Sequence, residues 1–282
     1  MIQRTEAVDC REEEAMGRRI EGMARILAVA SGKGGVGKTT VSVNLALALA
    51  ADGSRVGLFD ADIYGPNVPL MLGVPEMRSA QVMLPVARAE STPYLRPLWR
   101  YGLHVMSIGL LVADSDAVMP DPRVAGMLVT QTINDVAWGE LDYLLIDLPP
   151  GTGEPQHTLL QAVQVDGVVV VTTPQDLSLL DTGRSLQMFR KAHVPILGII
   201  ENMSYLVCPH CGERIDVFHQ TNRRWIARDE DLPVLGHIPM DTTISRAIDA
   251  GHPLVGAAPA TAGAAIFREI AWRVKQQLDQ ET

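Results

Sequence analysis

The sequence contains neither an apolar stretch long enough to cross a lipid bilayer nor a run of basic residues. A membrane-spanning helix needs about 20 consecutive apolar residues, so we expect no membrane partner. The net charge of −9 and the missing basic patch disfavour nucleic acid as a partner. The charged segment from Arg11 to Glu14 is unlike a secretory signal. We therefore expect a soluble, cytoplasmic protein that binds neither membranes nor nucleic acid.

Lysine is also scarce, since the chain has four lysines against 20 arginines. Two of the four, Lys33 and Lys38, lie within residues 32–40. Lysine supplies a compact point charge, whereas arginine supplies a planar fork of donors. The uneven distribution indicates that this short segment requires point-charge donors.

Residues 32–40 match the phosphate-binding pattern G-x-x-x-x-G-K-[ST]. The short apolar run Ile26–Ala30 precedes them, and apolar residues recur at helical spacing over Thr39–Ala51, so the context is strand, loop and helix. Backbone N–H groups of such a loop and the helix N-terminus bind phosphate oxygens. We expect Lys38 to reach the β and γ phosphates and Thr39 to ligate Mg²⁺. The predicted nucleotide-binding residues are Gly32, Lys33, Gly34, Gly35, Val36, Gly37, Lys38, Thr39 and Thr40.

Strand-like and helical segments alternate along the rest of the chain. Near-continuous apolar runs such as Val168–Val171 are typical of strands covered on both faces. This alternation predicts an α/β fold with a doubly wound, mostly parallel sheet and helices on both faces. We expect one domain over residues 23–282, a flexible tail over 1–22 and an exposed insertion over 78–102. The amphipathic segment Ala264–Leu278 is expected to pack on the sheet. The predicted strands are 26–30, 55–60, 104–108, 141–147, 167–172, 196–200 and 234–238.

Carboxylates end two of the predicted strands, at Asp60 and Asp62 and at Asp147. The carboxyl ends of parallel strands carry the ligand site in such sheets, so these side chains are expected beside the phosphates. Phosphoryl transfer needs a group that orients water and oxygen ligands that hold Mg²⁺. We assign Asp62 to water activation with a magnesium contact and Asp147 to the metal. Asp60 has two open interpretations, helix capping and an indirect metal role.

Several strings together resemble one family of nucleotide-binding proteins. The loop with its extra Lys33 is similar to that of the deviant Walker A ATPases, the group of MinD, ParA and the nitrogenase iron protein. The strings Asp60–Asn67, Asp147–Gly153, Glu201–Ser204 and Cys208–Gly212 narrow the resemblance to the Mrp/ApbC iron-sulfur cluster carrier ATPases, over residues 26–254.

The resemblance implies roles for further residues. Lys33 would reach the nucleotide of a second subunit, so that ATP binding and homodimer formation are one event. Asn202 would hydrogen-bond adenine, and backbone near Pro239 and Met240 would complete the base pocket. Two segments depart from the family pattern, residues 120–123 and residues 219–224. A partner contact of the family at residues 120–123 is therefore not expected to carry over. The change at residues 219–224 borders the expected cluster and has two open consequences, altered cluster stability and a different partner.

The pair Cys208 and Cys211 carries the specific function. Its spacing, in a loop with Pro209 and Gly212, allows two thiolates to converge on one metal centre. A [4Fe-4S] cluster takes four thiolates, so two subunits would each supply this pair to a bridging cluster. Three alternatives are open for the pair: a bridging Zn²⁺ with His210 as a further ligand, a thiol redox motif, and a disulfide. The remaining thiol, Cys10, is expected to be free.

The favoured hypothesis is a homodimeric ATPase that receives a [4Fe-4S] cluster from a scaffold or donor protein and transfers it to apo iron-sulfur proteins. Its cofactors would be ATP and Mg²⁺. The alternative is a positioning or partitioning ATPase of the MinD or ParA type, with cysteines that are incidental or bind zinc. Such proteins usually need an amphipathic membrane-targeting tail or a basic DNA-binding face. Ala264–Leu278 has few basic residues and includes Glu269, which favours the carrier.

Overall fold

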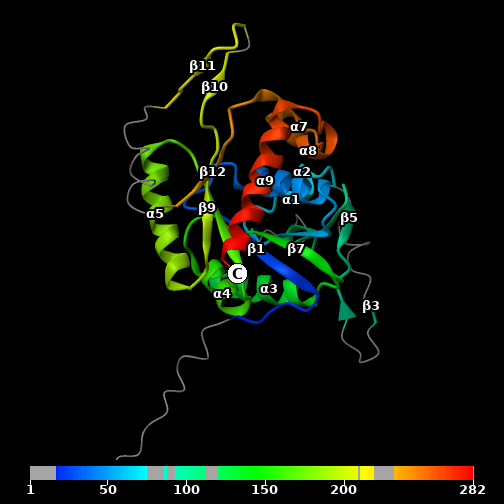
Figure 1. The fold of residues 1–282 in the computed structure, drawn as a ribbon. Helices are drawn as coiled ribbons and strands as arrows, with labels where there is room; N and C mark the ends of the chain where they lie inside the picture. Colours follow the sequence, from blue (N-terminus) through cyan, green and yellow to red (C-terminus); the bar gives the residue numbers. More distant parts are fainter. Residues whose placement is uncertain are drawn as a thin grey trace, which may run out of the picture.

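An eight-stranded sheet forms the centre of the structure, a computed structural model that describes residues 17–74, 86–87, 93–111, 120–208, 210–218 and 232–281 (Figure 1). Neighbouring strands are parallel, except that the edge strand β5 runs antiparallel to β6. Across the sheet the order is β12 (Val234–His237), β9 (Ile196–Glu201), β8 (Gly167–Thr172), β1 (Met23–Ser31), β7 (Leu141–Asp147), β2 (Val56–Asp60), β6 (Leu103–Ser107) and β5 (Leu98–Arg100).

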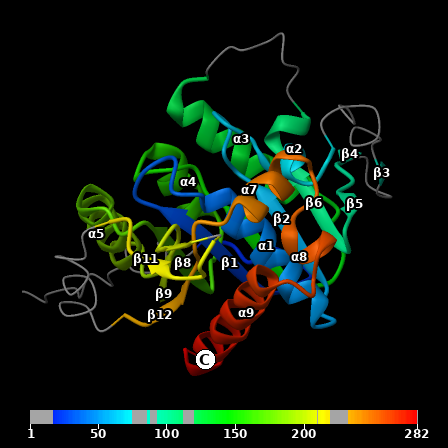
Figure 2. The same ribbon diagram turned by 90° about the horizontal axis from the view of Figure 1, so that it is seen from above.

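Helices cover both faces of this sheet (Figure 2). One layer contains α1 (Lys38–Ala51), α2 (Val68–Met71), α7 (Thr242–Asp249), α8 (Leu254–Ala257) and α9 (Ala262–Gln280). The other contains α3 (Pro122–Asp135), α4 (Glu154–Ala162) and α5 (Asp176–Lys191). Short elements complete the described chain: the 3₁₀ turn η1 (Ile108–Leu110) and the strand pairs β3 (Val86–Ala87) with β4 (Pro93–Tyr94) and β10 (Leu206–Val207) with β11 (Arg214–Ile215). The predicted doubly wound α/β fold is confirmed.

Strand β8 shows why the apolar runs are continuous. Successive side chains of a strand point to opposite faces. Val168 and Val170 accordingly pack in the core under α3, α4 and α5, whereas Val169 and Val171 pack in the core under α1 and α9. All four are fully buried. Covering both faces therefore requires an apolar residue at every position of the strand.

The C-terminal helix confirms the predicted packing of Ala264–Leu278. Helix α9 buries Phe267, Ile270 and Val274 against the sheet and α1. Among the described residues, none of the helices combines the length and the apolar character that a bilayer crossing requires.

Two expectations differ from the structure. Residues 17–22 contact the body of the protein: Ile20 is buried, and Arg18 forms a backbone bridge with Val163. The predicted insertion over residues 78–102 contains the edge strand β5, so its last residues belong to the sheet. The first 16 residues, with Cys10, lie outside the described residues, as do residues 219–224. At the other departure from the family pattern, Asp121 caps α3 by accepting a hydrogen bond from the Arg123 N–H at 2.9 Å.

The sheet register brings the acidic strand ends together. Asp147 at the end of β7 lies opposite Asp60 at the end of β2, and Asp60 lies opposite Ser107 at the end of β6. Strand β1 ends beside them and leads directly into residues 32–40. The fold therefore places the phosphate-binding loop and the carboxylates at one edge of the sheet, as the sequence predicts.

Candidate functional site

The phosphate-binding loop connects β1 to α1 in the conformation that its glycines permit. Gly35 and Gly37 both have φ of 80°, a left-handed conformation that favours glycine. Gly32 lies so close to α5 that a Cβ atom there would be 2.3 Å from the backbone carbon of Asp181. The loop lines a cavity of about 190 Å³ together with Asp62, Asn67, Met71 and Pro150. All the predicted loop residues except Gly32 and Val36 thus share one cavity with Asp62.

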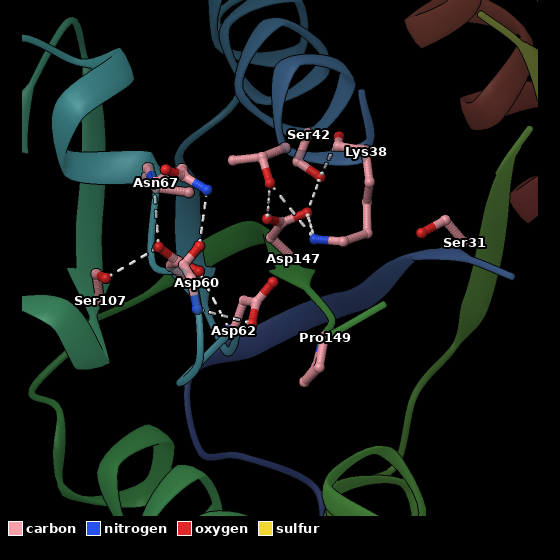
Figure 3. Close-up of polar contacts among 12 residues, drawn as sticks. Ser31, Lys38, Ser42, Asp60, Asp62, Asn67, Ser107, Asp147 and Pro149 are labelled. Carbon is pink, nitrogen blue, oxygen red and sulfur yellow. Dashed lines mark hydrogen bonds and ion pairs between the residues drawn. The ribbon is translucent and has the colours of Figure 1, made fainter. Parts of the chain in front are cut away.

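Asp147 is the centre of a buried polar cluster (Figure 3). The Lys38 ammonium lies 2.8 Å from its Oδ1 atom, and the Thr39 hydroxyl donates to Oδ2 at 2.8 Å. The Ser42 hydroxyl, one helical turn after Lys38, donates to Oδ1 at 2.5 Å. Asp147 is fully buried, so these three partners offset the cost of burying its charge.

The oxygen atoms of this cluster suit a hard cation. Thr39 Oγ1 and Asp147 Oδ2 lie 2.8 Å apart at the base of the loop, and Mg²⁺ takes hydroxyl, carboxylate and phosphate oxygens. Bound there, Mg²⁺ would offset phosphate charge. Thr39 and Asp147 therefore fit the magnesium role predicted for them, whereas Asp62 makes no contact with either among the hydrogen bonds of the described residues.

Asp60 has a capping role. Its Oδ2 atom accepts hydrogen bonds from the Ser107 hydroxyl at 2.9 Å and from the backbone N–H of Val68, at the start of α2, at 3.2 Å. Burial and the nearby charge of Asp147 raise the pKa of Asp60 to about 7. Of the two interpretations left open by the sequence, these contacts favour capping.

Asp62 lies just beyond the end of β2 and borders two hollows. One is the cavity of the phosphate-binding loop, and the other is a cavity of about 550 Å³ that is also lined by Tyr64, Pro149 and Gln156. Its Oδ1 atom accepts a hydrogen bond from the Gly65 N–H at 3.2 Å. Burial raises the pKa of Asp62, although the positive charge of Lys38 opposes this shift. A carboxylate with a raised pKa at a cavity wall suits proton acceptance from water.

Lys33 contacts a residue outside the phosphate-binding loop. Its ammonium group donates to the Gln175 side chain at 3.2 Å, next to the start of α5. Its backbone oxygen accepts a hydrogen bond from the Ser31 hydroxyl at 3.0 Å. Lys38 is thus buried beside Asp147, whereas Lys33, which lines the same cavity, is half-buried and contacts Gln175.

The three residues predicted for the base pocket lie on two neighbouring segments, which the Ile238 N–H joins by donating to the Glu201 backbone oxygen at 2.9 Å. Asn202 follows β9 and is buried; its amide nitrogen donates to the Val36 backbone oxygen at 2.8 Å. Pro239 and Met240 follow β12, and Met240 forms a backbone bridge with Leu206. The contact with Val36 places Asn202 against the phosphate-binding loop, while its adenine contact stays a prediction.

Cys208 and Cys211 lie at the tip of the β10–β11 hairpin, which projects from the body of the protein (Figure 1). Both are free thiols, Cys211 being exposed and Cys208 half-buried. The Cys208 N–H donates to the Glu213 backbone oxygen at 2.9 Å, and the Gly212 N–H donates to the Cys208 backbone oxygen at 2.9 Å.

Hydrogen-bond donors in the turn after Cys208 also point at the Cys208 sulfur. Hydrogen bonds from the backbone N–H groups of Cys211 and His210, and from the Cys211 thiol, lower the pKa of Cys208. Thiolates are the form that binds metals. Two neighbouring thiols, one exposed and one half-buried, lie on a turn whose donors lower the pKa of Cys208. Such a pair suits either an iron-sulfur cluster or zinc.

The structure adds residues that the sequence did not identify. Ser42 holds Asp147, Ser107 holds Asp60, and Gln175 holds Lys33. For Ser42 a signal was present, because it follows Lys38 by one helical turn and so lies on the same side of α1. Ser107 and Gln175 belong to other elements, and only the folded chain brings them to their partners.

The chain matches a sequence model of the ParA group described as the NUBPL iron-transfer P-loop NTPase, over residues 22–275. Among similar curated proteins, the iron-sulfur cluster carrier protein of Deinococcus radiodurans is 43% identical over 263 residues, which cover 93% of this chain and 72% of the relative. The mouse iron-sulfur cluster transfer protein NUBPL is 40% identical over 264 residues, which cover 92% of this chain and 79% of the relative.

Solved structures agree with the fold. A nucleotide-binding protein from Archaeoglobus fulgidus in complex with ADP is similar with a TM-score of 0.70 and 36% identity, over 83% of this chain and 89% of that one. The cell division ATPase MinD of Pyrococcus furiosus has a TM-score of 0.65 and 27% identity, over 90% and 99% of the two chains. The chain therefore belongs to the family of NUBPL iron-transfer P-loop NTPases and is an ATPase.

Proposed function

We propose that this ATPase is a carrier that binds a [4Fe-4S] cluster between two copies of the chain and transfers it to apoproteins in the cytoplasm. The observation that carries the proposal is the pair of the half-buried Cys208 and the exposed Cys211 on a projecting hairpin. This hairpin begins a few residues after Asn202, which contacts the phosphate-binding loop. The names of the relatives, iron-sulfur cluster carrier protein and transfer protein NUBPL, support the same cargo.

The thiol count requires a second copy. A [4Fe-4S] cluster takes four cysteine thiolates, and the hairpin supplies two. Two hairpins would complete the ligand set, with Cys208 and Cys211 of each copy. Because the thiols lie at the surface and not in a core, a cluster held there would be accessible to a donor protein and to recipient apoproteins.

The nucleotide site supplies the ATPase chemistry of the proposal. Lys38 would leave Asp147 for the β and γ phosphates, while Thr39 and Asp147 would hold Mg²⁺. Asp62, at the wall of the same cavity, would orient and deprotonate the attacking water. Lys33 would leave Gln175 and reach the nucleotide of the second copy. Hydrolysis would then depend on dimer formation.

One covalent segment connects the two sites. Asn202 donates to Val36 in the loop, Met240 donates from its backbone N–H to the Tyr205 backbone oxygen at 2.7 Å, and Cys208 follows at the end of β10. A nucleotide that moves the loop would displace Asn202 and with it the base of the hairpin. In this way the nucleotide state would change the grip of the two copies on the cluster.

The test is transfer of the cluster to an apoprotein. The reconstituted chain is mixed anaerobically with an apoprotein whose activity requires a [4Fe-4S] cluster, with free iron and sulfide at equal concentration as the control. We expect activity to return faster than in the control, to resist a small iron chelator, and to depend on Cys208 and Cys211. Recovery no faster than with free iron and sulfide would contradict the carrier function.

A further inference from the structure

The cavity of about 550 Å³ beside Asp62 is distinct from the phosphate site. None of residues 32–40 lines it, although Asp62 borders both this cavity and the cavity of the phosphate-binding loop. Its other walls include Tyr64 from the segment after β2, Pro149 from the segment after β7 (Figure 3) and Gln156 from the first turn of α4. Neither ATP nor Mg²⁺ is expected there, so the space is available to another ligand.

Gln156 carries an unsatisfied acceptor at the wall of this cavity. The residue is 1% exposed, and its Nε2 atom donates to the Pro149 backbone oxygen, which fixes the orientation of the amide. The Oε1 atom is buried and has no hydrogen-bond partner among the residues that the structure describes. A buried polar atom without a partner is destabilising, and folded proteins usually supply one. The ligand that completes this site must therefore be a hydrogen-bond donor.

The charges around the cavity favour a cation. Asp62 lines it from β2, and the exposed Glu154 lines it from the first residue of α4. A helix N-terminus ordinarily favours an anion through its free N–H groups. In the first turn of α4, however, Pro155 has no N–H, and the Gln156 N–H donates to the Gly153 backbone oxygen at 3.2 Å. Two carboxylates and few free donors therefore oppose an anion.

The remaining walls suit a planar cation. The Tyr64 ring, in a residue that is 40% exposed, lines the cavity together with Pro122, Pro149 and Pro150. A guanidinium group stacks on aromatic and flat apolar surfaces and presents five N–H donors, whereas a lysine ammonium is a compact and strongly hydrated charge. The free acceptor, the carboxylates and the apolar walls together match the side chain of arginine.

We propose that this cavity binds an arginine side chain of a partner protein. We call it the guanidinium pocket and define it by Asp62, Tyr64, Glu154 and Gln156. The guanidinium would donate to Gln156 Oε1 and stack on the Tyr64 ring, and the charges of Asp62 and Glu154 would attract it. A protein is the source because exposed residues, Tyr64, Pro150 and Glu154, border the pocket, and the net charge of −9 favours a basic partner surface. Such a pocket requires no cluster, so it stands apart from the proposed carrier function.

Capped tripeptides test the chemistry of the ligand. A glycine–arginine–glycine peptide is titrated into the full chain at low ionic strength, and binding is followed through the NMR signals of the Tyr64 ring. The matched controls replace arginine by citrulline, which has the same shape without the charge, or by lysine. We expect the arginine peptide to bind about tenfold more tightly than the citrulline peptide and about threefold more tightly than the lysine peptide.

Variants assign the binding to this cavity. Gln156→Leu removes the free acceptor, Glu154→Gln removes a charge and Tyr64→Leu removes the ring. Each should weaken binding of the arginine peptide by about threefold or more. Binding to the variants is measured by calorimetric titration, which does not need the Tyr64 signals. Because Gln156 is buried, its variant is also checked by thermal unfolding, while the exposed Glu154 and Tyr64 keep the test valid if Gln156→Leu does not fold.

Two further variants are controls. Tyr64→Phe keeps the ring and removes only the hydroxyl, which donates to the Pro120 backbone oxygen at 3.4 Å. Glu281→Gln makes the same charge change as Glu154→Gln at a separate cavity of about 380 Å³. Both should bind the arginine peptide as the parent chain does.

Three results would overturn the proposal. If no peptide binds, or if the arginine and citrulline peptides bind equally, the pocket does not recognise guanidinium and water alone fills it. If Glu281→Gln weakens binding as much as Glu154→Gln, the peptide responds only to net charge. If a dimer forms with ATP and expels the peptide, the second copy covers the pocket and an arginine of a separate partner is not its ligand. Cluster transfer is measured separately, so none of these results decides the carrier function.

Discussion

The side chain of Asp147, at the end of strand β7, contacts both the phosphate-binding loop and helix α1. It receives Lys38 and Thr39 from the loop and Ser42 from the body of α1. In the proposed mechanism Lys38 would turn to the phosphates and Thr39 would bind the metal, and Ser42 would then be the contact that keeps Asp147 in place. We therefore treat Ser42 as a positioning residue for the magnesium site.

Ser42→Ala should raise the Mg²⁺ concentration needed for half-maximal ATP hydrolysis by about tenfold, because a hydrogen bond to a charged group is worth about 1.5–3 kcal/mol. Steady-state hydrolysis measured against Mg²⁺ at saturating ATP checks this. Ser107→Ala is the matched control, since Ser107 is also fully buried but donates to Asp60. A similar shift in both variants would mean that Ser42 acts only through stability.

Asp60 should make stability depend on pH. Its pKa is raised from the usual range to about 7, so between about pH 4 and pH 7 the folded chain binds a proton that the unfolded chain releases. The stability from this residue is therefore lost as pH rises to 7. Asp60→Asn should remove that loss. The free energy of unfolding of the variant should therefore rise relative to that of the parent chain as pH approaches 7.

Urea unfolding of both chains at several pH values, with EDTA present, measures this difference in the free energy of unfolding. The variant keeps a side-chain oxygen that can accept from Val68 and Ser107. A difference that is constant with pH would show that Asp60 has the same pKa in the folded and unfolded chains.

At the scale of elements, the end of β9 supports the phosphate-binding loop. Gly37 packs so closely on Asn202 that a Cβ atom there would lie 2.3 Å from the amide nitrogen. That nitrogen donates to the Val36 backbone oxygen. The amide oxygen is therefore available to accept a hydrogen bond from the adenine amino group. Asn202 can thus hold the loop and the base together.

Asn202→Ala should lower the affinity for ATP by about tenfold and the affinity for GTP by less, because guanine carries no amino group at the equivalent position. Calorimetric titration with both nucleotides separates the two contacts. The smaller loss, common to both nucleotides, measures the bond to Val36. Equal losses of affinity for ATP and GTP would show that Asn202 does not recognise adenine.

Strands with a long apolar run were predictable from the sequence, whereas the short strand β5 was not. Strands β7 and β8 have the predicted bounds because most of their residues are apolar and buried. Strand β5 has three residues, and Trp99 within it is 67% exposed, so it carries no such pattern. Its position is determined by pairing with β6, a contact that sequence periodicity does not report.

The same limit applies to the site. Lys38, Thr39 and Asp147 follow from motifs, and the structure brings them together. The contact between Gln175 and Lys33 joins residues that are distant in sequence and has no motif. The capping role of Asp60 needed the position of α2, which the sequence left open.

At the scale of the whole molecule, Lys33 is the residue that we propose connects ATP binding to dimer formation. It is bonded to Gln175 and not to Asp147, so it is available to a second copy. Lys33→Ala should bind ATP with an affinity within about threefold of the parent chain but lose most hydrolysis and the ATP-dependent dimer.

Light scattering with and without ATP measures the dimer, and a hydrolysis assay measures turnover. Lys191→Ala, which replaces an exposed lysine, is the control. Fast hydrolysis by a Lys33→Ala monomer would contradict the shared site. The family match favours the cluster carrier over a positioning or partitioning ATPase.

The central claim is that Cys208 and Cys211 of two copies hold one [4Fe-4S] cluster. Anaerobic reconstitution of the parent chain and of the Cys208→Ser/Cys211→Ser variant, with iron, sulfide and zinc measured in each size-exclusion fraction, tests it most directly. We predict about two irons and two sulfides per subunit in a dimer, lost in the variant. Zinc that resists replacement, or iron that stays in the variant, would contradict the claim.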